Sequence, residues 1–270
     1  MSARREVFAI LVATIVATST LISRLVAADA PAPATQPIAI KNSSSIDDIL
    51  DALDARGKNL QDFSADVKLS NTDAASGDVT SSSGKVIFQH LPDGNARLRV
   101  SFDKKQVGNK IFPENHDYTL DGAWLVERDY QAKKEVRRQV LKPGQKLDLL
   151  KLGEGPFPLP IGQSKEDVKK LFEVKKVDAA KDDPAGTVHL LLTPKPDTAY
   201  AHKFKTIDIW VALDGAMPAR IETLDANGTV DKVTDLSNVK INAGLGDKDF
   251  TQAPLPSDGW EQINEPYGEQ

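Results

Sequence analysis

The sequence contains no cysteine among its 270 residues and only four histidines. Disulfide bonds, thiol nucleophiles and cysteine-bound metals are therefore excluded. We also expect no lipid anchor of the bacterial lipoprotein type, because its attachment needs a cysteine. The chain has to be held together by its hydrophobic core. Its 40% hydrophobic and 27% charged residues are an ordinary globular composition.

Basic residues do not outnumber acidic ones: 34 Lys and Arg stand against 39 Asp and Glu, and the formal net charge is −5. An acidic surface argues against nucleic acid or an anionic membrane as the main partner. The common acyl-transfer motif GxSxG is missing. The histidines, which are His90, His116, His189 and His202, lack the spacing of a zinc site. The densest group of possible ligands, at 114–117, is interpreted as a solvated loop. The sequence thus predicts no catalytic residues, no metal and no cofactor, and a protein that is not an enzyme.

The N-terminal region has the pattern of an export signal. An apolar run from Val7 to Ile22 follows Arg4 and Arg5, and small residues stand before Asp29. This pattern predicts a secretory signal peptide over residues 1–28, with an uncleaved membrane anchor as the alternative. Export without an anchor predicts a soluble periplasmic protein.

A Pro/Ala-rich stretch over residues 29–44 predicts a flexible tether. Ser45 can cap the helix that follows, and Gly57 can end it. The apolar residues of this helix recur at helical spacing: Ile46, Ile49, Leu50 and Leu53. A helix with a single apolar face has to lie on another apolar surface.

Strict alternation of apolar and polar residues begins at Phe63 and is clearest between Gly84 and Arg128. Alternation with a period of two predicts strands that have one apolar and one wet face. Turn chemistry at 92–95 and 121–122 joins them into an antiparallel meander. The residues assigned to the apolar face are Val86, Phe88, Leu98, Val100, Phe102, Tyr118, Leu120, Trp124 and Val126.

A second meander runs from residue 172 to 241, with Ile207, Ile209 and Val211 on one face and a hairpin signal at Asn227–Gly228. Helices are predicted at 45–57, near 146–152 and near 165–171. A Pro/Gly-rich loop separates the last two. The whole pattern predicts a mainly β fold with one antiparallel sheet of about ten or eleven strands, curled or rolled, over residues 45–260. Residues 261–270 are predicted to be a loose polar tail.

The order of these elements resembles the bacterial outer-membrane lipoprotein carrier (LolA-like) family. The matching segments follow the opening helix. They are FSADVKLS at 63–70, GKVIFQHLPDGNARLRV at 84–100, YTLDGAWLV at 118–126, GPFPLP at 155–160, HLLLTPK at 189–195 and the hairpin NGTV at 227–230. The likeness covers most of residues 45–260, and the shared order is more specific than any single segment.

The resemblance implies an incompletely closed β-barrel, or half-barrel, with short helices covering its open mouth. It implies a soluble periplasmic carrier, a chaperone that binds lipoprotein acyl chains in an apolar cavity and ferries them from inner to outer membrane. The apolar strand residues named above, including Ile207, Ile209 and Val211, would line that cavity. The lid would consist of Ile46, Ile49, Leu50 and Leu53 in the helix and of Phe157 and Leu159 in the loop. The implied partners are an acylated lipoprotein cargo, an inner-membrane ABC transporter and an outer-membrane lipoprotein receptor, with the carrier a monomer.

The sequence departs from the family at one position. Members carry an arginine directly before the proline that opens the first hairpin turn, where it helps to hold the lid. Here Leu91 precedes Pro92, so Arg97 or Arg99 would have to substitute. From the pattern alone, the apolar strand faces also suit an ordinary packed core. The alternative functions are an envelope sensor or another hydrophobic-ligand-binding module on the same scaffold.

Overall fold

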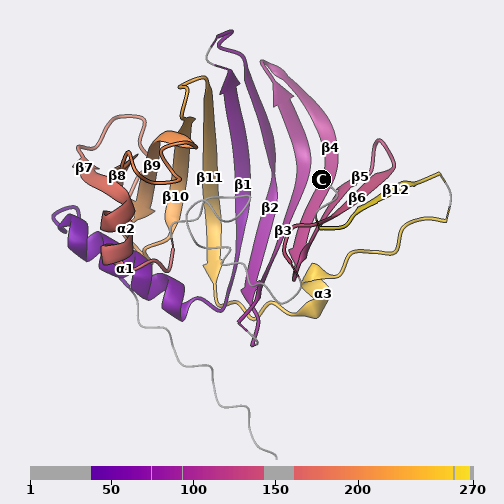
Figure 1. Cartoon of the computed structure of the whole chain (residues 1–270), viewed down its shortest axis with the longest axis horizontal. Helices are drawn as coiled ribbons and strands as arrows, with labels where there is room; N and C mark the ends of the chain where they lie inside the picture. Colours follow the sequence, from indigo (N-terminus) through magenta and orange to yellow (C-terminus); the bar gives the residue numbers. More distant parts are fainter. Residues whose placement is uncertain (1–37, 74, 93, 143–160, 258, 268–270) are drawn as a thin grey trace, which may run out of the picture. The chain divides into compact units, whose positions relative to one another are not determined.

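The computed structural model describes residues 38–267 apart from 74, 93, 143–160 and 258 (Figure 1). In this part of the chain one sheet of twelve strands has the order β12-β6-β5-β4-β3-β2-β1-β11-β10-β9-β8-β7. Its edges, β12 and β7, are not hydrogen-bonded to each other. The predicted fold class, a mainly β protein with an open curved sheet, is therefore confirmed. There is one strand more than expected, and the sheet is mixed because β12 pairs with β6 in parallel.

The bounds of the elements are as follows: α1 Ile46–Asn59, β1 Asp62–Asp73, β2 Val79–His90, β3 Ala96–Val107, β4 Lys110–Asp121, β5 Trp124–Asp129, β6 Lys134–Gln139, α2 Lys165–Leu171, β7 Phe172–Val177, β8 Thr187–Pro194, β9 Phe204–Ala212, β10 Pro218–Asp225, β11 Val230–Ile241, α3 Asp247–Phe250 and β12 Glu261–Glu265. The predicted helix near 146–152 lies outside the described residues.

The two meanders join where β1 pairs with β11, so the first strand along the chain lies in the middle of the sheet. Register shifts interrupt the β1–β11, β2–β3 and β3–β4 ladders, and such bulges increase the local twist of a sheet. Gly84 stands at one of them. A Cβ atom there would lie 1.8 Å from the carbonyl oxygen of Ser101, so only glycine allows the strands to approach this closely.

The helix α1 forms as its sequence predicts. The backbone N–H of Asp48 donates to Ser45 Oγ, and the N–H of Ser45 donates to Asp48 Oδ2, which completes a capping box. The residues Ile49, Leu50 and Leu53 are buried, while the first turn carries Asp47 and Asp48. The apolar face of α1 therefore packs against the protein, and its acidic first turn suits the positive end of the helix dipole.

Two boundaries drawn from the sequence are wrong. The tether predicted over 29–44 is packed at residues 38–40. There the N–H of Ile40 donates to the Leu213 carbonyl, the N–H of Gly215 donates to the Ile38 carbonyl, and Ile40 is buried. The tail predicted to be loose forms β12 over Glu261–Glu265. In the described part of the chain no helix is both long and apolar enough to cross a membrane.

Candidate functional site

One face of the sheet carries the apolar cluster that the alternation predicts. Nine of the predicted cavity residues are buried members of it: Val86, Phe88, Leu98, Val100, Phe102, Leu120, Ile207, Ile209 and Val211. Tyr118 is half-buried and packs against the cluster. We call this side of the sheet the inner face.

Trp124 and Val126 are not on the inner face, and their assignment to the cavity wall is wrong. In the hairpin between β4 and β5, Leu120 pairs with Leu125 and Asp121 pairs with Trp124. Directly paired residues share a face of an antiparallel sheet, so Leu125 joins Leu120 on the inner face. Trp124 and Val126 point to the opposite side, where the guanidinium of Arg137 lies 5.9 Å from the Trp124 ring centre.

The helix α1 closes one part of the inner face. Its residues Ile49, Leu50 and Leu53 belong to the same cluster as Ile207 and Ile209, and all five are at most 3% exposed. Ile46 is half-buried against the cluster. This part of the wall is filled by the protein's own side chains, so a ligand reaches it only if α1 moves. The predicted lid residues Phe157 and Leu159 lie outside the described residues.

A cavity of about 340 Å³ remains open on the inner face of β1–β5. Its lining is mainly apolar and consists of Leu69, Asn71, Ser82, Leu98, Phe102, Glu114, Tyr118, Leu120 and Leu125. The volume is at the lower end of the roughly 300–1,000 Å³ typical of small-molecule pockets. We call this the inner-face cavity. Leu69 and Leu125 were not predicted as lining residues, although Leu69 continues the apolar alternation of its strand.

The inner-face cavity has a polar end on β4 and β5. Glu114 Oε2 is buried without a hydrogen-bond partner. His116 Nε2 lies 3.0 Å from Glu127 Oε1, and the imidazole stacks on the Tyr118 ring with centres 4.6 Å apart. The segment 114–117 is thus part of a strand, and its interpretation as a solvated loop is wrong. All four residues of this segment are polar, so the sequence shows no apolar alternation that would indicate a strand here.

Tyr118 joins the apolar and polar parts of the cavity. Burial, followed by the negative charges of Glu127 and Glu114, raises the pKa of Tyr118 to about 12. The phenol therefore keeps its proton at neutral pH, and the Glu127 side chain is a hydrogen-bond partner for it. A ligand in this cavity would meet apolar side chains along most of its length and a phenol and a carboxylate at one end.

Arg56 fastens α1 to the sheet. It is 3% exposed, and its Nε donates to the Gly215 carbonyl at 2.6 Å. Burial lowers the pKa of Arg56, and the nearby Asp214 partly offsets this effect. A charged donor to a buried carbonyl is one of the stronger hydrogen bonds in proteins. Arg56 therefore ties α1 to the turn between β9 and β10.

Close backbone packing and ion pairs hold α1 at its other contacts. A Cβ atom on Gly57 would lie 2.2 Å from the Cα of Gly162, and the N–H of Gly162 donates to the Leu53 carbonyl. Lys165 on α2 lies 2.8 Å from Asp51, and Lys169 pairs with Asp47. The exposed pairs add little stability, whereas the glycine contact fixes how closely the helix can approach.

Arg97 and Arg99 do not substitute as a latch for α1. Arg97 donates to Gln89 and to Asp247 Oδ1, and its guanidinium lies 4.2 Å from the Phe250 ring centre. Arg99 donates to Asp117 Oδ2 at 2.7 Å. Both arginines alternate with inner-face residues, so they lie on the outer face, where Arg97 holds α3.

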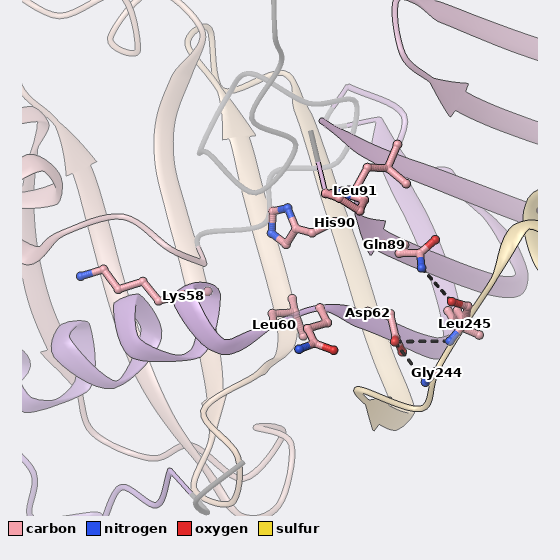
Figure 2. Close-up of a pocket in the computed structure, with 11 residues that line it drawn as sticks. Lys58, Leu60, Asp62, Gln89, His90, Leu91, Gly244 and Leu245 are labelled. Carbon is pink, nitrogen blue, oxygen red and sulfur yellow. Dashed lines mark hydrogen bonds between the residues drawn. The ribbon is translucent and has the colours of Figure 1, made fainter. Parts of the chain in front are cut away.

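A larger pocket of about 730 Å³ lies beside the end of α1 and the segment after β2. Figure 2 shows the residues that line it. His90 and Leu91, the residues before Pro92, line it together with Lys58. At its floor the Asp62 carboxylate accepts the backbone N–H groups of residues 243–245, and Gln89 donates to the Leu245 carbonyl. These polar groups satisfy one another, so the pocket offers a ligand fewer open partners than the inner-face cavity.

A metal site is not formed by the residues that the structure describes, since no three His, Asp or Glu side chains among them converge suitably. The apolar lining of the inner-face cavity can bury a ligand, and Glu114 and Tyr118 can form hydrogen bonds at one end.

No family model matches the sequence, and no curated protein matches it. Solved structures do. A conserved protein from Thermus thermophilus, described as uncharacterized, has a TM-score of 0.45 and 16% identity, and the alignment covers 80% of this chain and 97% of that chain.

Two further solved structures also match. A putative outer membrane lipoprotein-sorting protein domain from Vibrio parahaemolyticus has a TM-score of 0.36 and 12% identity, covering 75% of this chain and 94% of that one. A chain of the Pseudomonas aeruginosa MucA/MucB complex has a TM-score of 0.41 and 13% identity, covering 77% of this chain and 60% of that one. The resemblance seen in the sequence thus reappears among solved structures. At TM-scores below 0.5 this likeness carries no argument about function.

Proposed function

We propose that this protein is an exported, periplasmic carrier that binds a lipoprotein acyl chain in the inner-face cavity. The observation that carries the proposal is an open cavity of about 340 Å³ that continues a buried apolar cluster on one face of the sheet. Each methylene of an acyl chain buried there gains about 0.8 kcal/mol. The apolar wall alone can therefore supply affinity.

The size of the cavity suits one acyl chain. A cargo with several chains would need more of the inner face, and the adjoining wall is occupied by α1. Movement of α1 away from Ile207 and Ile209 would extend the site. The cost of breaking the Arg56 contact would then reduce the net affinity and help release. In this proposal α1 is the lid.

The polar end of the cavity favours an amphiphile over a plain hydrocarbon. Glu114 Oε2 has no hydrogen-bond partner, and a buried oxygen in that state costs free energy. An amide N–H or hydroxyl beside the acyl chain would provide the missing donor. An N-acylated lipoprotein terminus carries such an amide N–H.

A carrier of this kind would act as a monomer between a donor and an acceptor. We propose an inner-membrane ABC transporter as the donor and an outer-membrane lipoprotein receptor as the acceptor. A sensor on the same scaffold would bind its ligand without delivering it, so release of lipoprotein from inner-membrane vesicles separates the two functions.

Adjacent residues of β5 offer a matched test of the binding site. We expect a fluorescent fatty acid to saturate the wild-type protein. Leu125→Glu should weaken binding at least about tenfold because it places a charge in the cavity. Val126→Glu, on the opposite face, should leave the affinity unchanged. The proposal fails if the wild-type protein shows no saturable binding or if the two variants behave alike.

A further inference from the structure

The ends of three neighbouring strands carry exposed apolar side chains. They are Val79 at the start of β2, Val107 at the end of β3, and Ile111 and Phe112 at the start of β4. Ile111 is 68% exposed and Phe112 is 46% exposed. In the described part of the chain only Tyr130 and Tyr267 are other large hydrophobic side chains of comparable exposure. Exposed apolar side chains that gather in one place indicate an interaction site.

The β3–β4 hairpin extends beyond the packed part of the sheet. Residues 103–107 and 110–113 are all exposed, although they continue strands that are buried at Phe102 and Leu120. Phe112 pairs with Lys105, and Ile111 pairs with Gln106, so the two apolar side chains point to opposite faces. A flat protein surface covers one face of such a hairpin, whereas a lipid layer surrounds both.

The hairpin is basic in an acidic protein. Residues 103–113 contain Lys104, Lys105 and Lys110 against one acid, Asp103, while the whole chain has a net charge of −5. None of the three lysines forms an ion pair with a described residue. Asp78, directly before β2, partly reduces the local positive charge. Lysine side chains can lay their methylenes along apolar surface and place their charges at phosphate level.

We propose that the tip of the β3–β4 hairpin, residues 104–113, inserts shallowly into the headgroup layer of an anionic lipid bilayer. Val107, Ile111 and Phe112 enter the boundary of the acyl region, and the lysines contact lipid phosphates. The acidic remainder of the chain is repelled, which limits the contact to the tip and orients the molecule. The same two strands continue into the inner-face cavity at Phe102 and Glu114, so a docked tip holds that cavity near the lipid.

This inference does not depend on acyl binding, because the inserted side chains lie outside the inner-face cavity. Since the chain has no cysteine, Asn109→Cys in the turn of the hairpin provides a single site for an environment-sensitive fluorophore. Lys181→Cys, in an exposed turn elsewhere, is the control. The full chain is mixed with vesicles of phosphatidylethanolamine and phosphatidylglycerol, or of phosphatidylcholine alone.

Insertion predicts a blue shift of the label at position 109 with the anionic vesicles and none at position 181. Ile111→Ser combined with Phe112→Ser should weaken the response at least about tenfold. Replacing the three lysines by glutamine should remove the preference for anionic lipid.

Three results would overturn the inference. The first is no fluorescence shift at position 109 with anionic vesicles. The second is an equal shift at positions 109 and 181, which indicates adsorption through another part of the chain. The third is a shift that appears without vesicles when the protein concentration is raised, which indicates self-association.

Discussion

Glu114 gives the mainly apolar inner-face cavity a hydrogen-bond acceptor. Its Oε2 atom is buried and has no hydrogen-bond partner, although β4 could accommodate an apolar residue there. Groups of this kind are uncommon in folded proteins, and the cost of keeping one is consistent with a ligand that supplies the partner.

We therefore expect Glu114→Leu to stabilise the ligand-free protein by about 1 kcal/mol, because the unpaired oxygen is removed. The same variant should lose the preference for acyl chains with an adjacent amide or hydroxyl. Urea unfolding measures the first effect and competition between a fatty acid and its amide measures the second. A loss of stability would show that Glu114 already has a favourable partner.

Tyr118 provides a pH test of the same region. Its pKa of about 12 in the folded protein exceeds its ordinary value of 10.0. Its contribution to stability is therefore complete below about pH 10 and is lost as the pH rises toward 12. The wild-type protein should lose more stability over this range than Tyr118→Phe does, as measured by urea unfolding at each pH. Parallel pH profiles for the two proteins would contradict the raised pKa.

At the scale of elements, α1 is held by a backbone contact that tolerates no side chain. Gly57→Ala would place a Cβ atom 2.2 Å from the Gly162 Cα. We expect this overpacking to cost about 1–3 kcal/mol and to increase hydrogen exchange in α1.

Gly246→Ala is the matched control for that prediction. A Cβ atom at Gly246 meets no atom within 4 Å, and the backbone there is extended. This variant should change stability little. If both variants unfold at the same urea concentration, the Gly57–Gly162 contact does not hold the helix.

The sequence predicts most elements because their patterns are local. The spacing of Ile49, Leu50 and Leu53 defines α1, and period-two alternation defines the strands. The faces of β5 could not be predicted in this way. Trp124, Leu125 and Val126 are all apolar, so the choice of face depends on the hairpin register, in which Leu120 pairs with Leu125.

The cavity and the contact of Arg56 with Gly215 are less visible in the sequence than the strands. Strands that border the cavity show the same alternation of apolar and polar residues as strands covered by α1. Only the position of α1 in the structure distinguishes the two parts of the inner face. From the sequence, Arg56 is expected on the solvent-facing side of the helix. In the structure it is buried and donates a hydrogen bond to Gly215, which is far along the chain. Such long-range contacts have no local signature.

At the scale of the whole molecule, the C-terminal segment crosses the outer face and completes the sheet. Phe250 lies against Arg97, the Ala253 carbonyl accepts a hydrogen bond from Arg128, and β12 pairs with β6. Under this segment Arg128 and Glu135 form a buried ion pair at 2.6 Å. The polar composition of residues 261–265 gave no sign of a strand.

Removal of residues 258–270 should therefore expose the edge of β6. Unpaired edges are templates for pairing with another chain. We expect the truncated protein to self-associate as its concentration rises, while the full chain stays monomeric, in size-exclusion chromatography with light scattering. A truncated protein that remains monomeric at all concentrations would show that β12 is not needed to protect the edge.

The most direct test of acyl binding in the inner-face cavity is photo-crosslinking with a diazirine-bearing fatty acid, followed by peptide mass spectrometry of the full-length protein. Acyl binding in this cavity predicts crosslinks to Leu69, Phe102, Leu120 or Leu125 that an unlabelled fatty acid competes away. Crosslinks confined to the outer face, for example at Trp124 or Val126, or labelling that does not saturate, would contradict it.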